Sequence, residues 1–196
     1  MRIVVEGSNG AGKSTLINFL KDKYDLKYFH SNNQTENTLE YHQKLIEEDN
    51  VICDRFNLGE LIYPIIYARK PKMRYQDHEV LFKQMKLTNT ILIIFIDSIG
   101  DTLNKRLTSR GDTPEVLENS VIENQLFISV DKYLEKKYPE VVLTIDIAKV
   151  DDQIKYVEDV FDVKEKSDEA FKIDRQQCLD RASKKQSLQN TDNIVN

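Results

Sequence analysis

The amino-acid sequence predicts an α/β fold in which a parallel β-sheet lies between two layers of helices. Short apolar segments rich in β-branched residues alternate with longer amphipathic segments, which is the pattern of parallel strands joined by helices. A glycine-rich stretch, residues 7–14, separates the first apolar segment from the first amphipathic one. A chain of 196 residues is long enough to bury the core of one such domain. We therefore expect a three-layer α/β/α sandwich with a five-stranded parallel sheet.

The expected strands are short and β-branched, and in chain order they are Arg2–Val5, Leu26–His30, Val51–Cys53, Thr90–Asp97 and Val141–Asp146. Positions 91–96 are all apolar, so this strand should have both of its faces covered. Apolar residues recur with helical spacing in the segments between the strands. The expected helices are Lys13–Tyr24, Glu36–Glu48, Leu58–Ala68, Asp77–Thr88, Gly100–Ser109, Pro114–Lys137 and Val150–Asp162.

The composition changes near residue 164, beyond which the chain is polar and carries charges of both signs. Residues 1–163 are therefore predicted to form the folded domain. Residues 164–196 are predicted to be a polar tail, in which Phe171, Cys178 and Ala182 allow one docked helix before a disordered end.

The glycine-rich stretch matches the pattern G-x-x-x-x-G-K-[ST] at every fixed position, and it reads Gly7-Ser8-Asn9-Gly10-Ala11-Gly12-Lys13-Ser14. It stands between a predicted strand and a predicted helix, the context in which this pattern binds phosphate. Its backbone N–H groups can surround a phosphate, Lys13 can reach the β- and γ-phosphates, and Ser14 can hold Mg²⁺. A chance glycine turn is the alternative, and the flanking strand and helix disfavour it. The sequence predicts an ATP site that extends to Thr15, with Mg²⁺ as cofactor.

A second group of candidate residues, Asp54-Arg55-Phe56, follows the third predicted strand directly. Ligands of open parallel sheets bind outside the carboxyl ends of the strands, so this group should lie at the same edge as the glycine loop. Asp54 can join the shell of a magnesium ion or accept a proton, and Arg55 can grip a phosphate through its planar guanidinium. Many Asp–Arg pairs are structural, but beside a phosphate loop a functional role is favoured.

A third group comprises Arg106 and Arg110, which are four residues apart and therefore on one face of a helix. Gly111 follows them and can act as a hinge, so residues 106–120 are predicted to form a lid over the phosphates. A solvated basic helix face is the alternative.

The charge balance argues against a protein that holds polymeric nucleic acid on a broad basic face, because 28 Lys and Arg stand against 33 Asp and Glu. Small nucleotides are the nucleic-acid ligands that remain. The first predicted strand begins at Arg2, which leaves no room for a signal peptide, and no apolar run approaches the roughly 20 residues of a membrane span. Two widely separated cysteines, Cys53 and Cys178, fit a reducing compartment, so we expect a cytoplasmic protein without a membrane partner.

Taken in order, these motifs resemble the thymidylate kinase family of P-loop nucleotide and deoxynucleoside kinases, over about residues 2–162. Glu6 and the glycine loop resemble the first motif of that family. Asp54-Arg55-Phe56, with Gly59 and Tyr63 after it, is similar to the family's Asp-Arg-Tyr motif. The spacing from the fourth strand into the lid matches at Asp97, Arg106, Arg110 and Gly111.

The resemblance implies an enzyme that transfers the γ-phosphate of ATP to a deoxynucleoside monophosphate, with dTMP favoured. It implies that Arg55 binds the acceptor phosphate, that Asp54 lies near the metal and that Phe56 belongs to the substrate site. It also implies that Tyr63 lies under the deoxyribose, and that Arg106 and Arg110 close on the transferring phosphate. A homodimer is compatible with it.

The chain departs from the family in three ways. Asn9 stands where a carboxylate is usual, only about 40 residues separate the glycine loop from Asp54, and the segment that supplies a base-stacking phenylalanine has no counterpart. This short form looks like kinases carried by bacteriophages, for which the host cytoplasm would be the location. Two alternatives stay open. One is a deoxynucleoside kinase in which Asp54 takes the proton of the 5′-hydroxyl, and the other is a nucleotide-binding ATPase without a small acceptor.

Overall fold

The computed structural model describes residues 1–32 and 34–162, and the chain divides into two units, Met1–Gln153 and Ile154–Asn196. The described residues of the second unit, 154–162, are helical. The polar tail predicted at residues 164–196 lies outside the described residues.

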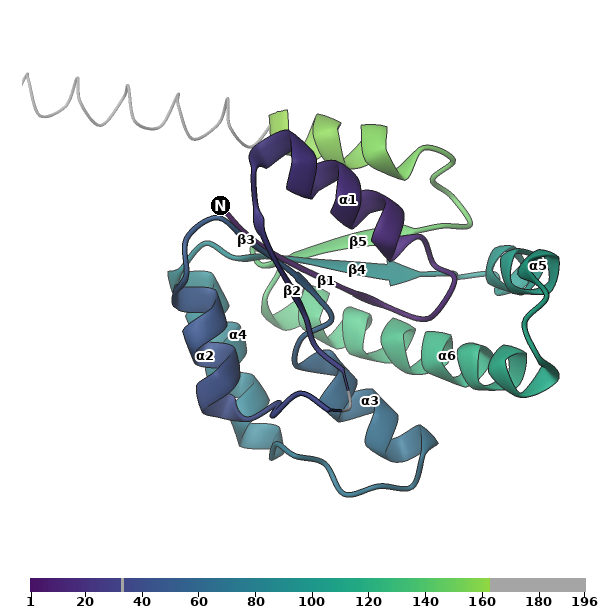
Figure 1. Cartoon of the computed structure of the whole chain (residues 1–196), viewed down its shortest axis with the longest axis horizontal. Helices are drawn as coiled ribbons and strands as arrows, with labels where there is room; N and C mark the ends of the chain where they lie inside the picture. The colour runs from purple at the N-terminus through teal and green to yellow at the C-terminus, as the bar shows by residue number, and fades with distance from the viewer. Residues whose placement is uncertain (33, 163–196) are drawn as a thin grey trace, which may run out of the picture. The chain divides into compact units, whose positions relative to one another are not determined.

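Within the described part of the first unit, five strands form one sheet in which every pairing is parallel (Figure 1). The strands are β1 Arg2–Gly7, β2 Lys27–His30, β3 Val51–Asp54, β4 Ile91–Ile96 and β5 Val142–Asp146. Their order is β2-β3-β1-β4-β5, so β1 is central and its end lies between those of β3 and β4. Positions 92–96 of β4 are all buried, as expected for an interior apolar strand. The predicted α/β fold with a five-stranded parallel sheet is confirmed.

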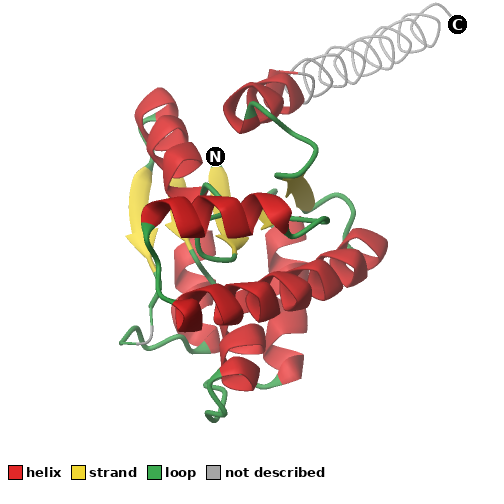
Figure 2. Ribbon diagram, turned by 90° about the vertical axis from the view of Figure 1, so that its right-hand side faces the viewer, coloured by secondary structure: helices red, strands yellow, loops and turns green. Residues whose placement is uncertain are grey.

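Helices cover both faces of this sheet, with α1 on one face and α6 on the other (Figure 1). The helices of the first unit are α1 Lys13–Tyr24, α2 Leu39–Glu47, α3 Leu58–Ile66, α4 Tyr75–Leu87, α5 Asp101–Arg110 and α6 Pro114–Lys137. The strands end on the side where α5 lies, and Figure 2 shows the molecule from that side. The loops that follow β1, β3 and β4 therefore meet at one edge of the sheet.

One of the larger differences between predicted and observed elements is at the start of α2, which begins at Leu39 and not at Glu36. Asn37 has a left-handed backbone (φ +48°), which a helix does not allow. The Thr38 hydroxyl then accepts a hydrogen bond from the Tyr41 N–H at 3.3 Å and caps the helix. The residues between β2 and α2 therefore lie outside the helix, and Ser31, Asn32 and Asn37 among them line a cavity.

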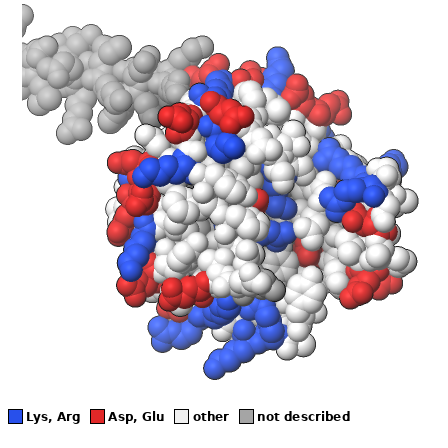
Figure 3. Space-filling view, viewed as in Figure 1, with Lys and Arg blue, Asp and Glu red and all other residues white. Residues whose placement is uncertain are grey.

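Charged side chains of both signs are interspersed over the face seen in Figure 3, with no broad field of either sign. Among the described helices, none is long and apolar enough to cross a membrane.

Two buried histidines, His42 on α2 and His78 on α4, lie in the core. Burial lowers the pKa of each to about 4, and for His42 the neighbouring His78 acts in the same direction. The His42 ring packs edge-on against Phe56 with 4.2 Å between ring centroids. Both imidazoles are therefore neutral in the folded protein at neutral pH.

Acid should destabilise the fold through His42. The unfolded chain binds a proton near pH 6.5 and the folded chain only near pH 4, so the stability contributed by a neutral His42 is lost as the pH falls from 6.5 towards 4. When the pH is lowered from 7 to 5, the wild type should lose about 2 kcal/mol of unfolding free energy that a His42→Leu variant does not lose. Urea unfolding at both pH values measures this difference. A Leu45→Val variant on the same helix should differ from the wild type equally at both pH values.

Candidate active site

The glycine loop leaves β1 through a backbone that only glycine can adopt. Gly7 has φ +140°, and a Cβ atom there would lie 2.7 Å from the Cβ of Phe95 on the adjacent strand. Gly10 has φ +78°, and a Cβ atom there would lie 2.7 Å from Cδ2 of Leu107 on α5. The loop is therefore held closely between β4 and α5, and it opens into the first turn of α1.

Lys13 lies inside this loop and is only 7% exposed. Its ammonium donates hydrogen bonds to the carbonyl oxygens of Gly7 (2.9 Å) and Ser8 (2.7 Å). Burial and then the nearby Arg55 lower the pKa of Lys13 to about 8, against the opposing effect of the Asp54 and Glu6 carboxylates. The loop thus holds a cation at its centre, next to the N-terminus of α1. Such a helix end attracts anions.

A cavity of about 460 Å³, here called the phosphate cavity, lies over the loop. It brings together residues of the glycine loop and the start of α1, of the ends of β2 and β3, and of α5. Its lining includes Asn9, Gly10, Gly12, Lys13, Ser14, Thr15, Asp54, Arg55, Arg106 and Arg110. Most of the residues that the sequence predicts for ATP binding and catalysis therefore surround one space.

Asp54 ends β3 beside this cavity, and its side chain is 13% exposed. Its Oδ2 accepts a hydrogen bond from the Tyr28 hydroxyl at 3.1 Å and lies 3.2 Å from Nδ1 of His30. The pairing of β2 with β3 places His30 directly opposite Asp54. The sequence analysis assigned no role to either partner, although a histidine at the end of a strand at the ligand edge was a usable signal.

Arg55 has a left-handed backbone, with φ +63°, which is uncommon for a residue with a side chain. Its N–H donates to the Val5 carbonyl at 3.0 Å, and its Nη2 donates to Asn9 Oδ1 at 2.8 Å. The guanidinium carbon lies 5.0 Å from the centroid of the Tyr63 ring. Asn9 therefore orients Arg55 from the glycine loop.

Glu6, at the end of β1, fixes the segment that follows Arg55. Its Oε1 accepts hydrogen bonds from the N–H groups of Phe56 (2.7 Å) and Leu58 (3.0 Å). Burial raises the pKa of Glu6 to about 7, against the opposing charge of Arg55. Phe56 is 1% exposed and its ring packs against His42, and the residue also lines the cavity that adjoins the phosphate cavity.

A second cavity of about 490 Å³, here called the acceptor cavity, adjoins the first and shares Asn9, His30 and Arg55 with it. Tyr63 lines it, and its hydroxyl is buried without a hydrogen-bond partner among the described residues. Its size suits a nucleoside or nucleotide. Arg55 lines both cavities, so two ligands, one bound in each cavity, would lie next to each other at this residue.

Glu123, on α6, is a residue of the acceptor cavity that sequence reasoning missed. It is 1% exposed, and its Oε2 accepts a hydrogen bond from the Asn9 N–H at 3.2 Å. Burial raises the pKa of its carboxyl group. Ser120, Glu123 and Asn124 lie on the buried side of α6 together with Phe127. Polar residues on an otherwise apolar helix stripe were the signal in the sequence.

The two arginines of the predicted lid both line the phosphate cavity but have different partners. Arg106 Nη1 donates to the Ala11 carbonyl of the glycine loop at 3.0 Å. Arg110 Nε donates to Asp112 Oδ2 at 2.7 Å, and its side chain is 56% exposed. Arg106 thus contacts the glycine loop directly, whereas Arg110 is paired with Asp112.

Asp97 directly follows β4, and its side chain binds backbone N–H groups of the loop and helix that come after it. Its carboxylate accepts hydrogen bonds from the N–H groups of Gly100 (2.9 Å) and Leu103 (2.7 Å) at the start of α5. This cap sets the direction of the helix that carries Arg106 and Arg110. Asp97 acts on the site through that helix.

The oxygen donors that fit Mg²⁺ in the phosphate cavity are the Ser14 hydroxyl and the Asp54 carboxylate, which both line it. Magnesium in such sites takes one or two protein ligands and completes its shell with phosphate oxygens and water. The described residues contain no cluster of three or more His, Cys, Asp or Glu side chains that could hold a metal ion.

Sheet order, glycine loop and adjoining cavities together define a P-loop protein with the fold of nucleotide and nucleoside kinases. The chain belongs to the family of YorR, an uncharacterized SPβ prophage-derived protein of Bacillus subtilis (strain 168). The two are 30% identical over 138 residues, which cover 63% of this chain and 76% of YorR. No family model matches the chain.

Solved structures with the same fold include YorR in complex with phosphorylated GDP, with a TM-score of 0.64 and 19% identity over 84% of this chain and 98% of that one. Another is deoxyadenosine kinase from M. mycoides with the products dCMP and dCDP, with a TM-score of 0.55 and 19% identity over 85% and 99% of the two chains. These likenesses support the P-loop kinase fold, and the resemblance to thymidylate kinases in particular stays a prediction.

Proposed function

We propose that the protein is an ATP-dependent phosphotransferase whose acceptor is a deoxynucleoside monophosphate, with dTMP as the first candidate. The observation that carries this proposal is the junction of the two cavities at Asn9, His30 and Arg55. A triphosphate on the glycine loop and an acceptor in the second cavity would bring their reacting ends together at this junction. Positioning and neutralisation of charge are most of what phosphoryl transfer requires from a protein.

The donor side of the reaction would be served by Lys13 and the glycine loop. Lys13 would exchange the Gly7 and Ser8 carbonyls for the β- and γ-phosphates, which are stronger partners for an ammonium group. Bound Mg²⁺, held by Ser14 and Asp54, would neutralise phosphate charge. Arg106, seated on Ala11, lies at the edge of the same cavity.

The acceptor side would be served by Arg55 and Tyr63. A phosphate at the junction would meet the Arg55 guanidinium, which Asn9 and the Tyr63 ring already orient. An oriented guanidinium loses less side-chain entropy on binding and can form two parallel hydrogen bonds to a phosphate. Tyr63 and the buried Glu123 line the space that the sugar would occupy.

A deoxynucleoside acceptor is the second candidate, and the charges around the acceptor cavity favour it. Arg55 and Arg69 are balanced there by Glu60 and Glu123, so the cavity is not built only for an anion. Asp54 lines the phosphate cavity, accepts a hydrogen bond from the Tyr28 hydroxyl and lies 3.2 Å from Nδ1 of His30, a residue of the junction. Its carboxylate would accept the proton of a 5′-hydroxyl as the oxygen attacks the γ-phosphate.

A coupled assay of ADP release separates these functions. The four deoxynucleoside monophosphates and the four deoxynucleosides are tested with ATP and Mg²⁺. We expect ADP release that depends on a monophosphate, and release that depends on a nucleoside would favour the second candidate. ADP release without any acceptor, at a rate that no acceptor raises, would identify an ATPase and contradict both proposals.

The lid arginines should act on turnover more than on binding. Arg110 is paired with Asp112 in this structure, and we expect it to turn onto the phosphates only when both substrates are bound, so that its contact forms mainly in the transition state. We expect Arg106→Ala and Arg110→Ala each to lower kcat by about tenfold or more, with smaller changes in ATP affinity. If the two act on one phosphate, the double variant should lose less than the product of the single losses.

A Lys105→Ala variant is the control, because Lys105 is exposed on the same helix and lies outside the lining of the phosphate cavity. Unchanged kcat in both arginine variants would show that Arg106 and Arg110 have no role in turnover, as expected of a solvated helix face.

A further inference from the structure

Two buried polar atoms in the acceptor cavity have no protein partner. Ser31 is 4% exposed and Asn37 is 5% exposed, and both line this cavity. Within residues 1–32 and 34–162, neither Ser31 Oγ nor Asn37 Oδ1 has a hydrogen-bond partner. Buried polar atoms are almost always bonded, so two such atoms facing one cavity indicate a ligand that completes their bonds.

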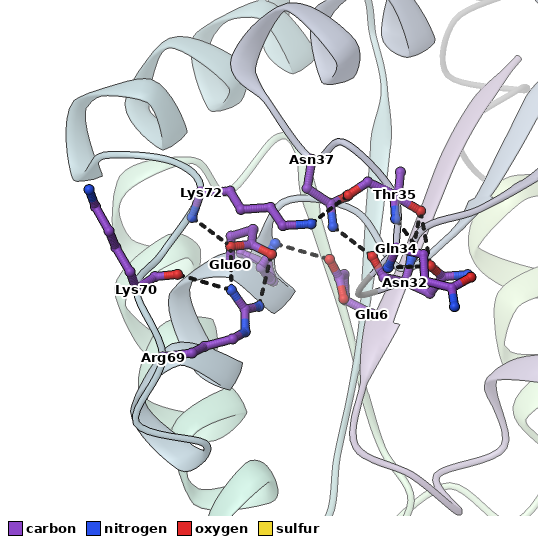
Figure 4. A network of polar contacts seen from close by, with 10 residues as sticks. Glu6, Asn32, Gln34, Thr35, Asn37, Glu60, Arg69, Lys70 and Lys72 are labelled. Carbon is purple, nitrogen blue, oxygen red and sulfur yellow. Dashed lines mark hydrogen bonds and ion pairs between the residues drawn. The ribbon is translucent and has the colours of Figure 1, made fainter.

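The orientation of the Asn37 amide is fixed by its neighbours, as Figure 4 shows. Asn37 Nδ2 donates to the Asn32 carbonyl at 2.8 Å, which leaves Oδ1 as the atom without a partner. Asn32 is itself held in a tight turn, because its Oδ1 accepts from the N–H groups of Gln34 (2.8 Å) and Thr35 (3.2 Å). The segment therefore presents a pre-oriented hydrogen-bond acceptor to the cavity.

The neighbouring wall of the cavity supplies donors. The Glu60 carboxylate accepts hydrogen bonds from Arg69 Nη1 (3.0 Å) and Nη2 (2.9 Å) and from the Lys72 N–H (2.9 Å). Lys72 Nζ donates to the Thr35 carbonyl at 2.6 Å, which ties this wall to the turn that holds Asn37 (Figure 4). The acceptor oxygens of Glu60 are thus bonded within the protein. Arg69 also lines the cavity, and because a guanidinium has five N–H donors, it has donors beyond those bonded to Glu60.

Ser31, Asn37 and Arg69 line only the acceptor cavity. In contrast, Asn9, His30 and Arg55 line both cavities. The reacting 5′ end of an acceptor has to lie at the shared residues. The base is attached to the opposite side of the sugar, so it would lie against the residues that are not shared.

We propose that Ser31 and Asn37 determine the base specificity of the acceptor and select a base with a ring N–H beside a carbonyl. This proposal rests on the proposed function in so far as the acceptor is a nucleoside or a nucleotide. Asn37 Oδ1 accepts the ring N–H, and Arg69 or the Ser31 hydroxyl donates to the base carbonyl beside it. Thymine and guanine carry this pair of groups, whereas adenine and cytosine have no ring N–H on that edge.

The test uses Ser31→Ala and Asn37→Gly, because glycine keeps the left-handed backbone of position 37 (φ +48°). Binding of the four deoxynucleosides and their monophosphates is measured by calorimetry, and kcat/KM is measured for those that turn over. We expect the wild type to favour thymine or guanine, and each variant to lose about tenfold of that preference while the KM for ATP is unchanged. Gln34→Ala, in the same turn but outside the lining of the cavity, is the matched control.

Two further readouts separate a base contact from a structural role. The Ser31 hydroxyl has no partner in the protein, so the melting temperature of Ser31→Ala should not fall. A thymine or guanine acceptor methylated at the ring nitrogen should bind the wild type more weakly, and Asn37→Gly should bind it and the unmethylated form alike.

Preference of the wild type for adenine or cytosine, or an equal loss for all four bases in both variants, would overturn the proposal. Because binding is measured without turnover, base-selective binding without phosphoryl transfer would contradict the proposed function alone. Absence of binding by every acceptor would contradict both.

Discussion

Replacing Lys13 with alanine is expected to lower kcat by about 10²-fold or more while the fold is retained. The Lys13 ammonium is the cation at the centre of the loop, 2.7–2.9 Å from two loop carbonyls that phosphate oxygens would replace. Charge develops on the transferring phosphoryl group in the transition state, and a buried cation stabilises it more strongly than an exposed one. Steady-state kinetics with the acceptor found in the ADP-release screen measures this loss.

The fold should tolerate the change, because burial makes the charged form of Lys13 less favourable, as the lowering of its pKa to about 8 indicates. Circular dichroism and the melting temperature check that the variant is folded. The matched control is Lys21→Ala on the same helix, whose ammonium is half-exposed and lies 3.7 Å from the Asp22 carboxylate. A folded Lys13→Ala protein with turnover near that of the control would exclude the P-loop kinase function.

The fold was predictable because its signals are local. The glycine loop, the apolar run of β4 and the alternation of strands and helices each depend on a few adjacent residues. The start of α2 was not predicted, since it depends on the left-handed backbone of Asn37 and the cap formed by Thr38. Helix ends are decided by single residues, which a periodic pattern does not resolve.

The candidate site was predictable only as far as the motifs extend. Asp54 and Arg55 could be expected at the phosphate edge, because parallel strands end together. The partners of Asp54 come from β2, and Glu123 comes from α6, more than a hundred residues from the glycine loop that it contacts. Contacts of this kind follow from strand order and helix packing, and a single sequence does not show which polar residue will face a cavity.

Arg55→Gly should separate acceptor binding from stability more cleanly than any other substitution in the site. Arg55 adopts φ +63°, a conformation that is strained for arginine by about 1–2 kcal/mol and unstrained for glycine. Relief of this strain should offset the loss of the contacts with Asn9 and Tyr63, so we expect the unfolding free energy to stay within about 1 kcal/mol of the wild type. An alanine at this position would keep the strain and is the less informative variant.

Catalysis should respond very differently from stability. Loss of the guanidinium at the junction of the two cavities removes a charge-assisted contact to the acceptor phosphate, which corresponds to about 2–4 kcal/mol in kcat/KM. The KM of the acceptor should rise, whereas the affinity for ATP measured without acceptor should scarcely change, because Lys13 and the loop remain. Arg55→Lys should recover only part of the loss, since an ammonium group lacks the planar pair of donors. Equal weakening of ATP binding would assign Arg55 to the donor phosphates and would contradict a monophosphate acceptor bound by this residue.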